Sequence, residues 1–191
     1  MPMSPGAICG YIWMVFVVVW LVMAFGTKTT QQRESVSSRL SYTVLVMAAF
    51  YLVFGKEIIQ PWLRIRLFQP SPITDWLGVA LTAAGIGFAI WARLYLGGNW
   101  SGAVTVKVGH ELVRTGPYRF VRHPIYTGLI TALLGTGLLR AQVRGLIALV
   151  LIYAGFKMKS KIEERAMIST FGTAYEEYRR STGAIVPKLY S

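Results

Sequence analysis

The sequence predicts an all-α polytopic membrane helical bundle, with about five transmembrane helices and a cytoplasmic C-terminal helix extension. Of the 191 residues, 54% are hydrophobic and 15% are charged, whereas roughly a quarter of the residues in a soluble domain are charged. The mean hydropathy is +0.48. The apolar residues also gather in runs close to the ~20 residues that a helix needs to cross a bilayer. These observations exclude a water-soluble globule and a disordered chain.

The first two helices are expected at about 8–25 and 40–60. The first run contains no charged residue, and no Lys or Arg precedes it, which disfavours a cleavable signal peptide. Cys9 is the only cysteine and lies inside this run. An intrachain disulfide is therefore impossible, and we expect a packed or lipid-facing thiol.

A third helix is expected at about 76–96, where Arg93 is the only charged residue. The preceding segment 69–75 contains two prolines, which interrupt helices. Thr74 or Asp75 is a suitable N-cap for the helix that follows. Residues 1–75 are therefore expected to form an N-terminal two-helix transmembrane region.

The last two apolar segments, at 125–139 and 143–156, are short and predict an antiparallel helical hairpin. The second helix is expected to continue to about Thr170. From residue 143 it would span about 42 Å at 1.5 Å per residue, which exceeds the ~30 Å hydrocarbon core. A re-entrant hairpin is the alternative and would reduce the crossings to three, because segments shorter than about 17 residues are ambiguous.

Folding this hairpin about Ala141 places His123 opposite Lys159, one helical turn from Glu163. Two polar clusters that are distant in the sequence are thus expected to meet at one surface of the membrane.

The net charge of +12 indicates membrane topology and contact with anionic lipid headgroups, not nucleic-acid binding. With five crossings, 14 of the 20 Lys and Arg residues lie on one side of the membrane and five lie on the other. The positive-inside rule then puts the N-terminus outside and the C-terminus in the cytoplasm.

Polar and aromatic side chains that could carry chemistry gather immediately before and inside the fourth helix. Glu163 and Glu164 lie on the extended last helix. Interfacial Arg and Tyr residues and a solvated Lys/Glu helix are the structural alternative. The clustered residues are His110, Arg114, Tyr118, Arg119, Arg122, His123 and Tyr126.

The sequence lacks the motifs of several common metal sites, catalytic triads and nucleotide-binding loops. The two histidines are too far apart in the sequence for a zinc or di-iron motif, so no metal is expected. The sequence shows no nucleophile triad, no GxGxxG loop and no P-loop lysine. The remaining rings, cations and carboxylates suit a zwitterionic, aromatic ligand.

The segment 109–128, which contains Arg-His-Pro-Ile-Tyr-Thr-Gly at 122–128, resembles the isoprenylcysteine carboxyl methyltransferase family and the related phospholipid N-methyltransferases. The downstream pair Glu163-Glu164, followed by Phe171-Gly172, extends the resemblance, which covers about 76–188. It implies a methyltransferase core at 76–191, with a cofactor loop at 97–124, a helical hairpin at 125–156 and a cytoplasmic helix at 157–191.

The resemblance also implies S-adenosylmethionine as the methyl donor and S-adenosylhomocysteine as the product. Arg122 is expected to orient the loop by hydrogen-bonding carbonyl groups. Tyr rings and aliphatic side chains can hold adenine, and carboxylates can accept hydrogen bonds from ribose hydroxyls or the donor's amine. The implied cofactor contacts are His110, Leu112, Val113, Tyr118, His123 and Tyr126, with Glu163 or Glu164 closing the pocket.

The methyl acceptor implied by the resemblance is lipidic or prenylated, and most simply a prenylcysteine-type carboxylate. The arginine that the prenylcysteine enzymes use for this carboxylate aligns with Ala89, and Arg93 lies four residues later. Arg93 is therefore either the residue that positions the substrate or a residue that snorkels to the headgroups. Lys159 and Lys161 stand where those enzymes carry arginine.

A phospholipid amine and a small thiol are alternative acceptors within the same chemistry. A non-enzymatic transporter or scaffold is the alternative from another class.

Overall fold

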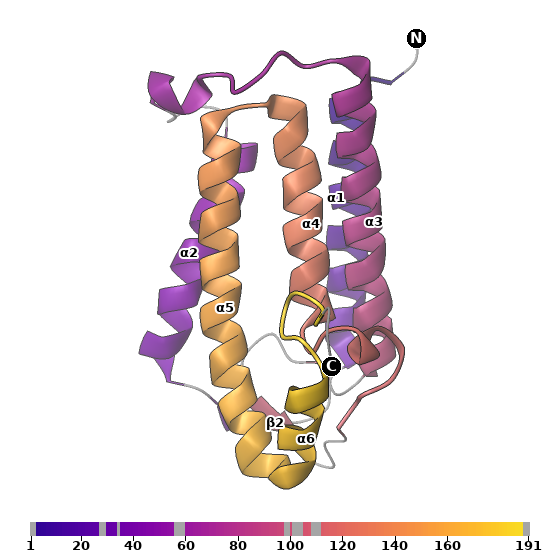
Figure 1. Ribbon diagram of the computed structural model, residues 1–191, viewed down its shortest axis with the longest axis vertical. Helices are drawn as coiled ribbons and strands as arrows, with labels where there is room; N and C mark the ends of the chain where they lie inside the picture. Colours follow the sequence, from indigo (N-terminus) through magenta and orange to yellow (C-terminus); the bar gives the residue numbers. More distant parts are fainter. Residues whose placement is uncertain are drawn as a thin grey trace.

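The computed structural model describes residues 3–26, 30–33, 35–55, 60–97, 100, 105–107 and 112–188. It is a helical bundle in which α1 to α5 run side by side along the long axis (Figure 1). The long helices are α1 (Pro5–Val22), α2 (Val36–Phe54), α3 (Pro72–Leu96), α4 (Pro124–Arg140) and α5 (Val143–Phe171), and the shorter α6 is Thr173–Ser181.

Within the described residues, α1, α2 and α3 are each long and apolar enough to cross a membrane, with mean hydropathies of 2.1, 1.5 and 1.6. Most of their residues are not buried inside the protein. Apolar side chains on the outside of a bundle suit a lipid environment. The helical and membrane character that the sequence predicts is therefore confirmed.

The helices begin earlier than predicted because serine caps precede them. Ser4 caps α1 and Ser35 caps α2. Before α3, the Ser71 side chain accepts a hydrogen bond from the Thr74 amide at 3.2 Å, while the Thr74 hydroxyl accepts one from the Ser71 amide at 2.9 Å. This capping box, with proline at the first helical position, starts the helix at Pro72. The prediction of Thr74 or Asp75 as N-cap was therefore wrong.

Helices α3 and α4 approach each other closely at glycines. A Cβ on Gly85 would lie 2.5 Å from the Gly128 carbonyl oxygen, and a Cβ on Gly135 would lie 2.5 Å from the Gly78 carbonyl oxygen. Small residues allow this backbone contact, which drives helix association in membranes. The contact fixes α4 against α3.

A buried polar network joins α1 to this pair of helices. The Trp13 indole donates a hydrogen bond to the Thr136 hydroxyl at 2.9 Å, which lies 3.2 Å from the Thr82 hydroxyl. The Cys9 thiol lies 3.5 Å from the same Thr82 oxygen. Cys9 is thus a free, buried, packed thiol, as expected.

The hairpin of α4 and α5 turns at Ala141, which adopts a left-handed conformation with φ 50°. The extended segment before α3 stabilises this turn, since the Leu67 amide donates to the Ala141 carbonyl and the Val143 amide to the Ile65 carbonyl. The predicted hairpin geometry is therefore present. Helix α5 is continuous to Phe171, where Gly172 with φ 53° allows the chain to fold back into α6.

Two short strands depart from a purely helical fold. Strand β1 (Thr30–Arg33) pairs antiparallel with β2 (Thr105–Lys107). The pairing satisfies backbone groups that no helix can satisfy, and it joins the connection after α1 to the connection after α3.

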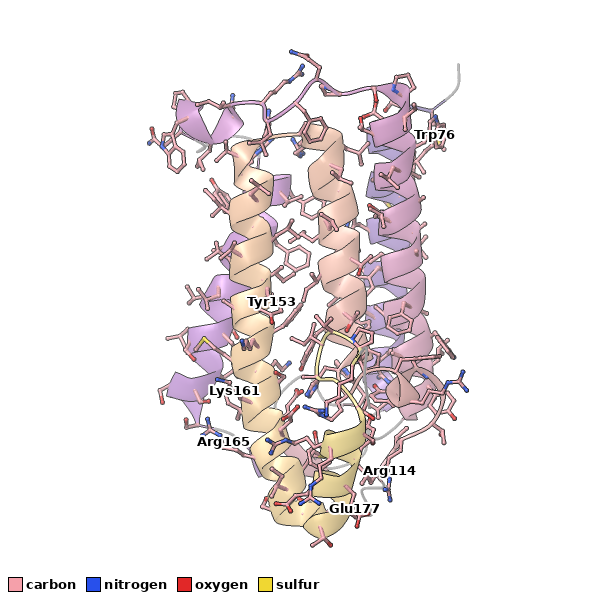
Figure 2. All side chains as sticks on the ribbon, viewed as in Figure 1. Trp76, Arg114, Tyr153, Lys161, Arg165 and Glu177 are labelled. Carbon is pink, nitrogen blue, oxygen red and sulfur yellow. The ribbon has the colours of Figure 1, made fainter. Side chains whose placement is uncertain are left out.

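The two ends of the bundle differ in the side chains they carry. Trp76 lies at the end where α3 begins, near the turn that carries Arg140 and Arg144, and a second group of charged side chains lies at the other end (Figure 2). The labelled charged residues at that end are Lys161, Arg165, Arg114 and Glu177. The candidate site lies on this end, where α4 begins.

Candidate functional site

The imidazole of His123 lies between two carboxylates of α5. Its Nδ1 atom is 3.3 Å from Glu163 Oε2 and its Nε2 atom is 3.2 Å from Glu164 Oε1. Pro124 begins α4 directly after His123, and the turn at Ala141 brings α5 back alongside. The structure thus brings together the two polar clusters that the sequence predicts to meet.

An aromatic stack extends from His123 into the bundle. The His123 and Tyr126 ring centroids are 5.4 Å apart with nearly parallel planes, and those of Tyr126 and Phe156 are 4.5 Å apart. The Tyr126 hydroxyl donates to Glu163 Oε1 at 2.6 Å. Tyr126 therefore combines an aromatic face with a polar contact to the acid pair.

Arg122 binds Glu164 and two backbone carbonyls. Its Nε and Nη2 atoms donate to Glu164 Oε1 at 2.9 and 2.7 Å. Its Nη1 atom donates to the carbonyl oxygens of Arg179, at 3.2 Å, and Thr182. The expected contact of Arg122 with carbonyl groups is present, and its ion pair with Glu164 adds a second restraint.

Tyr42 of α2 is a neighbour of the site that the sequence did not reveal. The Lys159 Nζ atom lies 5.4 Å from the Tyr42 ring centroid and 5.5 Å from that of Tyr126, and 4.0 Å from Glu163 Oε1. The Tyr42 side chain is buried. Only the packing of α2 against α5 places it here, and no local sequence pattern reports that contact.

The acid pair and the imidazole stabilise each other's charged forms. Burial alone would lower the pKa of His123, but hydrogen bonds and charges from Glu163 and Glu164 raise it overall. Burial alone would raise the pKa of each glutamate. The His123 contact, with Lys159 for Glu163 and Arg122 for Glu164, lowers both below the ordinary range. The protonated ring, in which both nitrogens donate, is thus favoured.

Other predicted residues lie around this cluster. Tyr118 is buried, and its hydroxyl donates to the Ala92 carbonyl of α3 at 3.4 Å. Val113 packs against the core, and Leu112 is partly buried. His110 lies outside the described residues.

Arg93 is not part of the His123 cluster. Its Nη1 and Nη2 atoms donate to the carbonyl oxygens of Gly97 and Met23 at 2.9 and 2.6 Å, and its guanidinium lies 4.3 Å from the Trp100 ring centroid. Only 2% of the residue is exposed, and among the residues that the structure describes Nε has no hydrogen-bond partner. The snorkelling interpretation was therefore wrong, because the charge is enclosed by the ends of α1 and α3.

A family model described as phospholipid methyltransferase matches residues 73–174. The chain belongs to the phospholipid methyltransferase family. The match covers α3, α4 and α5, and with them His123, Tyr126 and the acid pair.

Individual relatives are similar over parts of the chain. A protein-S-isoprenylcysteine O-methyltransferase of Schizosaccharomyces pombe is 35% identical over 42% of this chain and 34% of its own length. Methanethiol S-methyltransferase 1 of Bradyrhizobium diazoefficiens is 32% identical over 91% of this chain and 64% of its own length. The chain thus spans less than two thirds of the length of either relative.

A solved structure shares the fold. The eukaryotic intramembrane Ras methyltransferase, isoprenylcysteine carboxyl methyltransferase, matches with a TM-score of 0.53 and 24% identity, over 78% of this chain and 52% of that one. Together with the apolar helices, this likeness identifies an integral membrane protein.

Proposed function

We propose that this chain is an integral membrane methyltransferase that uses S-adenosylmethionine to methylate a lipidic acceptor, most simply the carboxylate of a prenylcysteine. The observation that carries the proposal is the imidazole of His123 held between Glu163 and Glu164 beside an aromatic stack. Family membership supports the reaction class.

The residues of the cluster suit the donor's chemistry. A sulfonium donor carries a methyl group that an incoming nucleophile can displace, together with an ammonium, a carboxylate, ribose hydroxyls and adenine. The Glu163 side chain keeps 21% of its surface exposed, and carboxylate oxygens accept more than one hydrogen bond. Because the Tyr126 ring is already stacked with His123 and Phe156, the adenine is left to the other face of His123 and to the aliphatic side chains of Leu112 and Val113.

The chain's contribution to methyl transfer is binding and alignment. Glu164 has its Oε1 atom occupied by Arg122 and His123, so it holds the imidazole in place. Glu163 and Tyr126 remain to contact the donor. An ionised carboxylate acceptor needs no general base, whereas an amine must arrive deprotonated. The imidazole of His123, whose pKa Glu163 and Glu164 raise, is a poor base at neutral pH, which favours an acceptor that arrives as an anion.

The acceptor's charge needs a cation, for which the sequence suggests Arg93. Its two terminal nitrogens already bind carbonyl oxygens, so an acceptor would have to exchange with those bonds or reach Nε. Burial raises the pKa of Tyr118, Glu163 raises it further and Arg93 lowers it. The Tyr118 hydroxyl donates to the carbonyl of Ala92, the residue next to Arg93, so Tyr118 connects the surroundings of Arg93 with Glu163, which supports Arg93 as a substrate-positioning residue.

We propose a number of membrane crossings and an orientation for the same protein. Five crossings by α1 to α5, with the N-terminus outside, put the His123 cluster and the end of α5 in the cytoplasm, where S-adenosylmethionine is made available. Residues 1–75 then form a two-helix membrane region, and residues 76–191 form the methyltransferase core. Anionic headgroups are the expected neighbours of the basic cytoplasmic surface.

A small thiol is the second candidate acceptor, because the methanethiol enzyme matches 91% of this chain. A phospholipid amine is the acceptor suggested by the family's description. A transporter would instead pair polar groups along a pathway through the membrane. The described bundle instead contains one local polar network whose members bond to each other, which does not favour a transporter. Its members are Cys9, Trp13, Thr82 and Thr136.

A methyl-transfer assay tests the proposal. Detergent-purified protein with radiolabelled S-adenosylmethionine is offered a prenylcysteine, phosphatidylethanolamine and a small thiol in parallel. We expect methylation of the prenylcysteine, abolished by His123→Ala. Methylation of the thiol or the amine alone would replace the proposed acceptor. No methylation of any acceptor, together with no binding of S-adenosylhomocysteine, would refute the enzyme.

A further inference from the structure

The C-terminal segment Thr182–Ile185 pairs with the loop that precedes α4. The amides of Arg122 and His123 donate to the carbonyl oxygens of Gly183 and Ala184 at 2.9 and 3.0 Å, and Val121 forms a parallel bridge with Gly183. This segment follows α6 and lies beyond the residues that the family model matches.

Among the described residues, the amides of Arg122 and His123 make no other backbone hydrogen bond. The loop's residues lie outside α4, and Pro124 offers no amide hydrogen. His123 is the N-cap residue, yet its side chain makes no capping hydrogen bond, since the ring faces the glutamates of α5. Buried backbone amides require partners, and the C-terminal segment supplies them for both Arg122 and His123.

The same segment restrains the side chain of Arg122. The carbonyl oxygen of Thr182 accepts a hydrogen bond from Nη1, while Nε and Nη2 bind Glu164. One guanidinium therefore connects the start of the segment to the carboxylate that holds the imidazole of His123.

The end of the segment is anchored in the bundle. The Ile185 side chain is 6% exposed and belongs to the hydrophobic core. The Thr127 hydroxyl of α4, one turn beyond His123, donates to the Ile185 carbonyl at 2.6 Å. At the other end of the segment, the Tyr178 hydroxyl of α6 donates to the Tyr118 carbonyl at 2.5 Å.

We propose that Thr182–Ile185 is a positioning strap that fixes the backbone of Arg122 and His123 and thereby sets the imidazole between Glu163 and Glu164 for donor binding. The strap acts through His123 and contacts no reacting atom. The proposal rests on the proposed function only for the identity of the ligand, because the hold on His123 is a property of the fold.

Gly183→Ala is the test variant. A Cβ at this position would lie 1.9 Å from the backbone oxygen of Val186 and 3.0 Å from the Lys188 nitrogen, so the turn that returns the strap cannot form unchanged. Gly87→Ala is the matched control, because a Cβ there meets nothing within 4 Å. Thr127→Val is a milder variant that keeps the side-chain shape and removes the hydrogen bond to the Ile185 carbonyl, together with the longer contact of the same hydroxyl with the His123 carbonyl at 3.3 Å. This variant replaces Gly183→Ala in the test if Gly183→Ala does not fold.

The first readout is the titration of His123 by NMR of ¹⁵N-histidine-labelled protein. The chain has two histidines, and the signal lost in His110→Gln assigns them. We expect the pKa of His123 to fall towards the ordinary value of about 6.5 in Gly183→Ala, to fall less in Thr127→Val, and to stay unchanged in Gly87→Ala. The second readout is calorimetry with S-adenosylhomocysteine, whose affinity should fall at least tenfold in Gly183→Ala.

The two readouts separate the strap from the enzyme. An unchanged His123 titration in Gly183→Ala and Thr127→Val would overturn the strap whatever the ligand. A shifted titration with undiminished affinity would overturn its role in donor binding. If the His123 titration shifts in the variants but the wild-type protein binds no S-adenosylhomocysteine, the strap's hold on His123 would be supported and the proposed donor would be refuted.

Discussion

Exchanging each member of the acid pair for its amide should separate structural support from ligand binding. Glu164 Oε1 accepts from two nitrogens of Arg122 and from His123, and the Arg122 and Glu164 side chains are only 8% and 14% exposed. Glu163 is more exposed, at 21%, and its closest contact is the Tyr126 hydroxyl. Glu164→Gln should therefore mainly destabilise the fold, and Glu163→Gln should mainly weaken ligand binding.

The magnitudes follow from these contacts. A hydrogen bond to a charged group contributes about 1.5–3 kcal/mol, and removing one partner of a buried ion pair is costlier than losing a surface pair. For Glu164→Gln we expect a loss of about 2–3 kcal/mol, or a fall in Tm of roughly 5–10 °C for a chain of this size. Glu163→Gln keeps an oxygen for Tyr126 but loses the charge that faces His123 and Lys159, so we expect a smaller loss of about 1–1.5 kcal/mol.

Thermal unfolding and calorimetry on the same detergent-purified samples test this contrast. S-adenosylhomocysteine should bind at least tenfold more weakly to Glu163→Gln, which is about 1.4 kcal/mol. The reasoning fails if the two variants lose equal stability, or if Glu163→Gln binds the product as tightly as wild type.

Three further outcomes are expected. Gly85→Ala should lower the thermal midpoint, because the added methyl group forces α3 away from the backbone of α4, and such overpacking costs about 1–3 kcal/mol. Gly87→Ala on the same helix, where a Cβ meets nothing within 4 Å, should keep or raise the midpoint, because alanine favours a helix more than glycine does. Equal midpoints would contradict the close contact. The folded pKa of His123 is raised, so the stability that the protonated ring adds is complete below the ordinary pKa of about 6.5 and is lost as pH rises through the folded value. The folded pKa values of Glu163 and Glu164 are lowered, so the stability that the two carboxylates add is present above about pH 4.3 and is lost at more acidic pH. The difference in Tm between wild type and His123→Asn should therefore be largest near pH 5–6.5 and shrink towards alkaline pH, and a difference that grows with pH would be the contrary result. A reporter fused at the C-terminus should be protected from impermeant label in intact cells, and labelling from outside would reverse the topology.

The sequence predicts the helices better than it predicts their neighbours. Runs of apolar residues locate α1 to α5, because hydropathy and helix length are local properties. The proline-containing segment 69–75 marks a boundary near the start of α3, although its last four residues belong to that helix. It does not identify Ser71 as the cap, because the pairing of Ser71 with Thr74 depends on side-chain geometry.

The meeting of His123 with the acid pair is predictable from the hairpin, since two helices joined by a short turn must lie antiparallel. Tyr42 and the C-terminal strap are not predictable in this way. Tyr42 reaches Lys159 only through the packing of α2 on α5, and the strap pairs through backbone atoms that carry no sequence signature. The same is true of Arg93, whose partners are carbonyl oxygens at the ends of two helices.

The glycine contact between α3 and α4 also restricts how a lipid can reach the site. Gly78 and Gly85 leave no room even for a methyl group against α4, so a hydrocarbon tail cannot slide through that seam. Gly137 and Gly145, where α4 faces α5, are in ordinary van der Waals contact. A lipid acceptor of the proposed reaction therefore has to enter along another face of the bundle, such as the seam between α4 and α5, where a Cβ on Gly137 would lie 3.7 Å from its nearest neighbour.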